Sequence, residues 1–260
     1  MRPWRIIPLL ASALALVSCK EDAPLGNPPD YLVEVHESAT FDYLLYEPLN
    51  RSLAENGRYP LIISLHGIGE RGSDPHLLRR DGLPAVVETD ADFPFYLIAP
   101  QCPATTEWYY HRTDTLTHAF IRLMLARYPI DPARVYLTGY SMGGIGTWDM
   151  AIRHPQWFAA IVPIAARRES YWDPCSMTGI PVRAFHGALD EVVPLAAGQD
   201  VVDAFAACGG DVKFTVYPGV YHDSWTRTYN SKALFEWLLQ QRKEHVNDGT
   251  DSRYGAKRPS

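Results

Sequence analysis

Short apolar runs alternate with longer amphipathic segments along most of the chain. The apolar runs predict buried strands near residues 61–65, 95–99, 134–138, 161–164, 182–186 and 213–217. The amphipathic segments between them predict helices at 116–128, 142–154, 195–208 and 232–242. An alternating segment at 41–46 predicts an additional, edge-type strand. Strands that alternate with helices indicate an α/β fold, with a mostly parallel central sheet and helices on both faces.

The length of 260 residues suits one large α/β domain, which we place at residues 31–243. Arg2 and Arg5 precede an apolar stretch at 6–17, the pattern of a signal peptide over residues 1–18. Residues 19–30 are polar and proline-containing, which predicts a flexible tether, and the polar tail 244–260 is expected to be disordered.

The signal segment ends in Leu16-Val17-Ser18-Cys19, which looks like a bacterial lipobox. Cleavage before Cys19 and lipidation of its thiol would anchor the chain to a membrane without spanning it. Lys20 follows where many inner-membrane lipoproteins carry aspartate, so we expect an exported protein that faces the periplasm, with the outer membrane favoured. The alternative is an ordinary cleaved signal peptide in which Cys19 has no role.

The sequence Gly139-Tyr140-Ser141-Met142-Gly143 follows a predicted strand and opens a predicted helix. This is the setting of a nucleophile elbow, where glycines allow a tight turn that exposes a serine hydroxyl. A serine in an ordinary glycine-rich loop is the alternative. The strand before it and the helix after it favour Ser141 as a nucleophile.

A serine needs a base, and the base needs an orienting acid. Asp190 follows the predicted strand at 182–186, and His222 follows the strand at 213–217 and a Pro-Gly turn. Both lie at carboxyl ends of parallel strands, where such sheets place their sites. We therefore predict a catalytic triad of Ser141, Asp190 and His222; helix capping is the alternative role for Asp190. His66 and His186 are predicted to be structural.

Ester hydrolysis places negative charge on an oxygen atom, which two N–H donors would stabilise. We assign one to the backbone of Met142, at a helix N-terminus. The second is assigned to Ile68, in the His66-Gly67-Ile68-Gly69 turn after an earlier strand, where an ordinary glycine turn is the alternative.

These motifs resemble the α/β-hydrolase superfamily, and within it the bacterial secreted esterase or "predicted peptidase" group, close to polyhydroxybutyrate depolymerases and prolyl oligopeptidases. Matching segments are H-G-I-G-E-R-G-S-D from His66, A-P-Q-C-P from Ala99, G-Y-S-M-G-G-I-G-T-W from Gly139, A-F-H-G-A-L-D from Ala184, K-F-T-V-Y-P-G from Lys213 and H-D-S-W-T from His222. The resemblance implies an α/β-hydrolase fold, a triad of Ser141, Asp190 and His222, and hydrolysis of carboxylic esters.

Only 17 residues separate the strands at 161–164 and 182–186, so no large lid domain fits there and the site is expected to be open. Such a site suits exposed or polymer-linked esters. Trp108 and Trp225 lie in loops expected at its rim and are candidate substrate-binding residues. For either tryptophan, core packing is the alternative.

Cys175 precedes one strand, and Cys208 ends the helix that follows it. A helix that returns antiparallel to its strand brings its end near the strand's start, so we predict a Cys175–Cys208 disulfide, which export would permit. Cys102 is expected to be a free thiol.

The net charge of −6 gives no indication of nucleic-acid binding. We find no metal-ligand spacing, expect no cofactor, and expect a monomer.

The sequence therefore predicts a serine carboxylesterase anchored by lipid. A prolyl-oligopeptidase-like serine peptidase is a second hypothesis, weakened by the absence of a propeller or specificity domain. A non-catalytic module that binds surface glycans is a third, and the intact triad argues against it.

Overall fold

The computed structural model describes residues 33–36, 41–48, 54–90 and 93–243. The predicted signal peptide, the tether with Cys19 and the C-terminal tail lie outside the described residues, and so do the domain boundaries drawn there.

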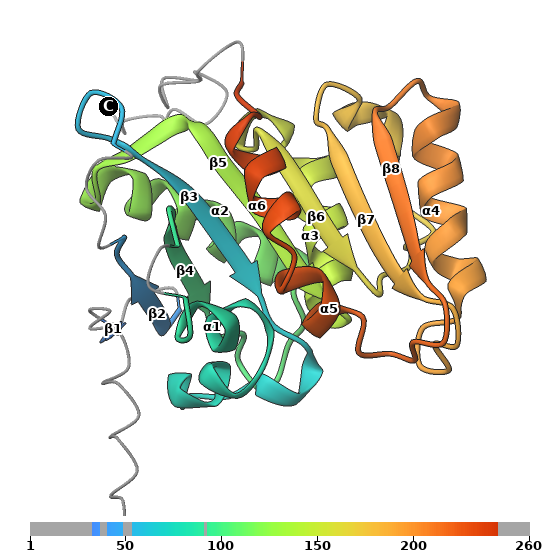
Figure 1. Cartoon of the computed structure of the whole chain (residues 1–260), viewed down its shortest axis with the longest axis horizontal. Coiled ribbons are helices and arrows are strands. Elements are labelled where there is room, and N and C mark those ends of the chain that lie inside the picture. Colours follow the sequence, from blue (N-terminus) through green and yellow to red (C-terminus); the bar gives the residue numbers. More distant parts are fainter. Residues whose placement is uncertain (1–32, 37–40, 49–53, 91–92, 244–260) are drawn as a thin grey trace, which may run out of the picture.

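Eight strands form one sheet, in the order β1-β2-β4-β3-β5-β6-β7-β8 (Figure 1). The strands are β1 Val33–His36, β2 Tyr43–Tyr46, β3 Tyr59–Leu65, β4 Tyr96–Pro100, β5 Ile130–Tyr140, β6 Ala160–Ile164, β7 Val182–Gly187 and β8 Val212–Tyr217. Strands β3 to β8 run parallel, whereas β1 and β2 pair antiparallel. This mostly parallel sheet confirms the predicted fold class.

The prediction that the strand at 41–46 lies at the edge of the sheet was wrong. Strand β2 pairs with β4 on one side and with β1 on the other, and all four of its residues are buried. The sequence analysis did not predict β1, which takes the edge position and covers β2.

Helices cover both faces of the sheet (Figure 1). The apolar residues of α2 (His111–Arg127), α3 (Met142–Arg153) and α4 (Leu195–Ala207) pack into one core cluster. Those of α1 (Gly82–Val87), α5 (Trp225–Tyr229) and α6 (Lys232–Leu239) pack into a second cluster on the opposite face. The sequence analysis missed α1 and α5, because a helix of five or six residues is too short to show a 3.6-residue period.

The sheet separates the two clusters, and its strand β5 ends at the nucleophile elbow. Because side chains alternate along a strand, Val135 and Leu137 face the α2–α4 side, whereas Tyr136 and Tyr140 face the α1–α6 side. Tyr140, directly before Ser141, therefore lies in the second core, where it contacts Trp225.

The segment between β6 and β7 contains one short 3₁₀ helix, η5 (Pro174–Met177), and no additional domain. This agrees with the predicted absence of a large lid. Within that segment, Cys175 is bonded to Cys208, the residue that caps α4, with 5.2 Å between their Cα atoms. The structure thus contains the Cys175–Cys208 disulfide that the antiparallel directions of strand and helix predicted.

The disulfide should stabilise the α4 side of the sheet. It closes a loop of 33 residues, and the loss of chain entropy in the unfolded state corresponds to about 3–4 kcal/mol. We expect the double substitution Cys175→Ser and Cys208→Ser to lower the Tm by about 10 °C. Calorimetry of the oxidised wild type and the variant measures this difference, and equal Tm values would contradict the prediction.

Candidate active site

Ser141 occupies a strained turn between β5 and α3. Its φ of 54° and ψ of −121° lie in a region that non-glycine residues rarely adopt, and its backbone N–H donates to the carbonyl of Ile164 at 3.0 Å. A Cβ atom at Gly143 would lie 2.0 Å from the Leu65 carbonyl oxygen, and one at Gly139 would lie 2.4 Å from that of Gly143. The two outer glycines of the motif therefore let three backbone segments meet under the serine.

His222 connects Ser141 with Asp190. Its Nε2 atom lies 2.9 Å from the Ser141 hydroxyl oxygen, and its Nδ1 atom lies 2.8 Å from Oδ2 of Asp190. A carboxylate accepts hydrogen bonds, so Nδ1 carries a proton and Nε2 is left to accept one from the serine. Loops after β5, β7 and β8 thus bring together the hydroxyl, carboxylate and imidazole that the sequence placed at strand ends.

Backbone donors hold the Asp190 carboxylate in place. Its Oδ1 atom accepts hydrogen bonds from the backbone N–H groups of Val192 and Val193, at 2.9 and 2.8 Å. His186 donates from Nε2 to the Val193 carbonyl at 2.8 Å, and burial lowers the pKa of His186 below its ordinary value. His186 is therefore neutral and braces the Asp190 loop, in line with its predicted structural role. Sequence reasoning had no signal for the two valine amides.

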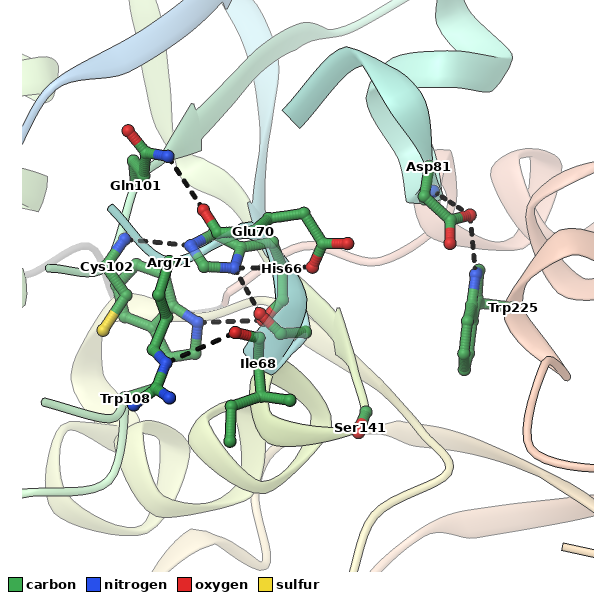
Figure 2. Close-up of polar contacts among 12 residues, drawn as sticks. His66, Ile68, Glu70, Arg71, Asp81, Gln101, Cys102, Trp108, Ser141 and Trp225 are labelled. Atoms are coloured by element: carbon green, nitrogen blue, oxygen red, sulfur yellow. Dashed lines mark hydrogen bonds and ion pairs between the residues drawn. The ribbon is translucent and has the colours of Figure 1, made fainter. Parts of the chain in front are cut away.

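The two predicted oxyanion donors lie on segments that follow neighbouring strands. Met142 is the first residue of α3, where the helix dipole favours negative charge, and Ile68 begins the 3₁₀ helix η2 (Ile68–Glu70). Ile68 and Ser141, both labelled in Figure 2, follow β3 and β5, which pair up to Leu65 and Gly139. The donation of their N–H groups to a reacting oxygen stays a prediction.

The Ile68 turn is held in place by the segment after β4 (Figure 2). The Cys102 backbone N–H donates to Nε2 of His66 at 2.9 Å, and the Trp108 indole donates to the His66 carbonyl at 3.0 Å. The Gln101 side chain donates to the Glu70 carbonyl at 2.8 Å. These contacts fix both ends of the turn, so the direction of the Ile68 N–H is set by strand β4 as well as by β3.

His66 makes the stability of this region depend on pH. Burial lowers the pKa of His66 to about 4, whereas in an unfolded chain it is about 6.5. Between pH 6.5 and pH 4 the unfolded chain gains a proton that the folded protein does not. The contribution of His66 to stability is therefore complete above pH 6.5 and falls by about 3 kcal/mol toward pH 4. Glu70, 3.8 Å away, has a raised pKa and opposes part of this loss.

Denaturant titrations of the wild type and His66→Gln at pH 7 and pH 4 measure this effect. Glutamine keeps an acceptor for the Cys102 amide but does not titrate, so the free energy of unfolding should fall less with acidification in the variant. Parallel pH dependences in the two proteins would contradict the assignment to His66.

The prediction that Trp108 binds substrate at the rim was wrong. Trp108 is fully buried, its ring packs against Phe41 and His66, and Gly146 on α3 leaves the space that it fills. The segment after β4 folds inward because the indole N–H finds its acceptor in the His66 carbonyl. Trp108 is a core residue that supports the Ile68 turn.

Trp225 also departs from its predicted place. Only 8% of its surface is exposed, and its ring lies between Tyr140 and His222 with the indole N–H bonded to Asp81. Trp225 therefore contacts the imidazole of His222 rather than the rim of the site. The sequence could not reveal this, because Asp81 lies 144 residues away along the chain.

The loops around Ser141 instead expose other apolar side chains. Four large ones, between 46% and 68% exposed, adjoin the predicted site residues in the chain; they are Ile68 itself, Leu189 and Val192 near Asp190, and Tyr221 before His222. We call these four residues the apolar rim. Their positions just after predicted strand ends were the signal that sequence reasoning passed over.

Cys102 is a buried free thiol, and burial raises its pKa to about 12, so it is an inert thiol rather than a nucleophile. Within the described parts of the chain, no group of three or more His, Cys, Asp or Glu side chains is arranged to hold a metal ion. Among the helices that the structure describes, none is long and apolar enough to cross a membrane.

The sheet order and the elbow serine define an α/β-hydrolase. The chain belongs to the phospholipase/carboxylesterase family (Abhydrolase_2), whose model matches residues 91–235.

Sequence relatives and solved structures agree with this placement. NocK, a candidate esterase of Nocardia uniformis subsp. tsuyamanensis, is 31% identical over 143 residues, or 52% of this chain and 41% of its own length. Feruloyl esterase B of Neurospora crassa is 32% identical over 111 residues, or 38% of this chain and 36% of its own. A thermostable esterase superposes with a TM-score of 0.67 at 30% identity, covering 83% of this chain and 64% of that one. The chain thus spans about two fifths of the curated relatives that it matches.

Proposed function

We propose that this chain is a serine carboxylesterase. The observation that carries the proposal is the continuous contact from the Ser141 hydroxyl through His222 to Asp190, with 2.9 and 2.8 Å between the bonded atoms. Membership of the phospholipase/carboxylesterase family and the esterase relatives support the same chemistry.

In the proposed reaction, Ser141 Oγ attacks the ester carbonyl carbon while His222 Nε2 takes the hydroxyl proton. The oxygen that becomes negative is stabilised by the N–H groups of Met142 and Ile68. Collapse breaks the bond to the alcohol oxygen, which leaves with the proton from His222. Water, deprotonated by the same imidazole, then attacks the acyl carbon; the acyl–Ser141 bond breaks, His222 returns the proton to Ser141 Oγ, and the acid is released.

We further propose that the substrate carries a large apolar or aromatic group and that its ester is exposed, for example on a polymer. The apolar rim supports this, since its exposed side chains are next to the proposed triad and oxyanion residues in the chain. The short β6–β7 segment supports it as well, because no lid domain is inserted between these two strands. The feruloyl esterase among the relatives is a precedent for an aromatic ester.

A substrate panel tests both parts of the proposal. We expect turnover of p-nitrophenyl butyrate and a higher kcat/KM for methyl ferulate or hydroxybutyrate oligomers than for p-nitrophenyl acetate. Cleavage of dipeptidyl amides with little activity on esters would favour the peptidase hypothesis. A wild-type protein that neither turns over esters nor labels with a fluorophosphonate would favour a binding module.

We also propose that Cys19 carries the lipid anchor of an exported protein that faces the periplasm. The lipobox sequence supports this. Cys19→Ser should move the protein from the membrane fraction to the soluble periplasmic fraction of expressing bacteria, because one cysteine carries all the lipid chains. A variant that stays in the membrane fraction as the wild type does would refute the anchor.

A further inference from the structure

The residues that follow His222 fold back against its imidazole ring. Trp225, three residues later, begins α5, and its ring centroid lies 5.3 Å from that of His222 at an interplanar angle of 87°. Asp223 accepts hydrogen bonds from the backbone N–H and the hydroxyl of Thr226, which ties the start of this helix to the loop. The indole thus occupies a side of the imidazole that neither Ser141 nor Asp190 takes.

Asp81 fixes the indole from another element of the fold. The Trp225 Nε1–H donates to Oδ1 of Asp81 at 2.8 Å, and the same oxygen accepts the backbone N–H of Gly82 at the start of α1 at 2.7 Å (Figure 2). Because α1 packs against the sheet through buried leucine and valine side chains, it gives the tryptophan a rigid attachment point.

Tyr140, in the nucleophile elbow, contacts the indole from a third direction. Its ring stacks on Trp225 with centroids 4.4 Å apart at an interplanar angle of 25°. A Cβ atom at Gly82 would lie 2.6 Å from the Tyr140 ring, and one at Gly67 would lie 2.9 Å from it. The ring is therefore held between α1, the turn that carries Ile68, and the indole.

We propose that Asp81, Tyr140 and Trp225 form a clamp that positions His222 against Ser141, with Asp81 and Trp225 acting as positioning residues. The inference rests on the proposed function, because it concerns the orientation of the proposed general base. An imidazole turns about two side-chain bonds, and Asp190 holds only one of its nitrogens. The clamp blocks rotations that keep the Asp190 bond but carry Nε2 away from the serine.

The physical consequence is a loss of rate rather than of substrate affinity. A displacement of the base by about 1 Å can cost about a hundredfold in rate, whereas the apolar rim that would bind substrate is unchanged. The clamp therefore predicts a lower kcat with KM little altered when the attachment of the indole is removed.

Asp81→Ala and Asp81→Asn form the main test. Alanine removes the acceptor of the indole N–H, and we expect kcat for p-nitrophenyl butyrate to fall about tenfold with KM within about twofold. Asparagine keeps an oxygen at the same place and should restore most of the rate. Asp74→Ala is the matched control, since Asp74 also caps a short helix, through the His76 amide, but does not bond to the indole. It should keep the wild-type kcat.

Trp225→Phe and Trp225→Leu extend the series. Phenylalanine keeps an aromatic ring but loses the bond to Asp81, so kcat should fall about as far as in Asp81→Ala. Leucine removes the aromatic stacking as well, so kcat should fall further in Trp225→Leu than in Trp225→Phe. Trp157→Phe is the control for replacing a buried tryptophan, since the Trp157 N–H has no hydrogen-bond partner among the residues that the structure describes. Should Trp225→Leu fail to fold, the Asp81 pair decides the question alone.

Histidine ring ¹⁵N shifts add a readout that does not require turnover. The clamp predicts that the Nε2 shift of His222 shows a hydrogen bond from Ser141 in the wild type and Asp81→Asn and loses this signature in Asp81→Ala, while Nδ1 stays protonated in all three. Asp81→Ala with wild-type kcat and wild-type His222 shifts, but a lowered Tm, would overturn the clamp and leave a structural role. Absence of ester hydrolysis in the wild type would instead refute the proposed function, and the ring shifts would still report on the clamp.

Discussion

Ser141→Ala should abolish hydrolysis of short p-nitrophenyl esters, lowering kcat by about six orders of magnitude if the serine acts as in other triad hydrolases. Alanine removes the only atom that could form the acyl bond while leaving the elbow and its glycines in place. The His222 imidazole would lose the partner that lies 2.9 Å from its Nε2 atom. Steady-state rates with purified wild type and variant, measured in parallel, give the ratio.

Ser176→Ala is a suitable control, because within the described residues this exposed serine hydroxyl donates to the nearby backbone carbonyls of Ile152 and Asp173. A fluorophosphonate should label the wild type and Ser176→Ala at Ser141 and should not label Ser141→Ala. Wild-type turnover in Ser141→Ala would exclude a serine esterase mechanism for this chain.

Asp190→Asn should lower kcat by about four orders of magnitude, with a small effect on KM. The carboxylate Oδ2 accepts the Nδ1 proton of His222 at 2.8 Å, whereas an amide nitrogen placed there would donate. Nδ1 would then act as acceptor and the proton would move to Nε2, so the ring could no longer accept the serine proton. The valine amides at the other oxygen would keep the loop in place, which confines the change to the tautomer.

Asp149→Asn separates this effect from the general cost of altering a buried carboxylate. Asp149 is buried on α3, accepts the Trp172 indole proton at 2.7 Å and pairs with Arg153, but it lies two turns beyond the elbow. We expect it to lower the Tm and to leave kcat within a few-fold of the wild type. A kcat for Asp190→Asn within tenfold of the wild type would refute its assigned role.

Much of the fold could be predicted because its signals are local. The runs near 61–65, 134–138 and 182–186 are mostly apolar and have glycine or proline residues nearby, and each forms a strand of the sheet. Short or marginal elements gave no such signal. Strand β1 has four residues and α5 has five, so neither contains enough repeats for a period to emerge.

Some residues of the candidate site could also be predicted from the sequence, and others could not. Ser141, Asp190 and His222 were predictable because each follows a strand in the order that α/β-hydrolases use, and parallel strands bring their carboxyl ends to one edge. The tryptophans were not, because an aromatic residue in a loop can serve as rim or as core. Trp108 and Trp225 went inward because acceptors from distant segments, the His66 carbonyl and the Asp81 carboxylate, satisfy their N–H groups.

The sequence by itself determined the class of fold, the strained serine turn and the chain order of the three reactive side chains, since these depend on patterning and on glycines at fixed spacing. The tertiary structure alone decided which neighbours hold those side chains in place. The indole beside His222, the amides on Asp190 and the brace on the Ile68 turn join segments from different strands and helices. Such contacts follow from how layers pack in space, and no local pattern encodes them.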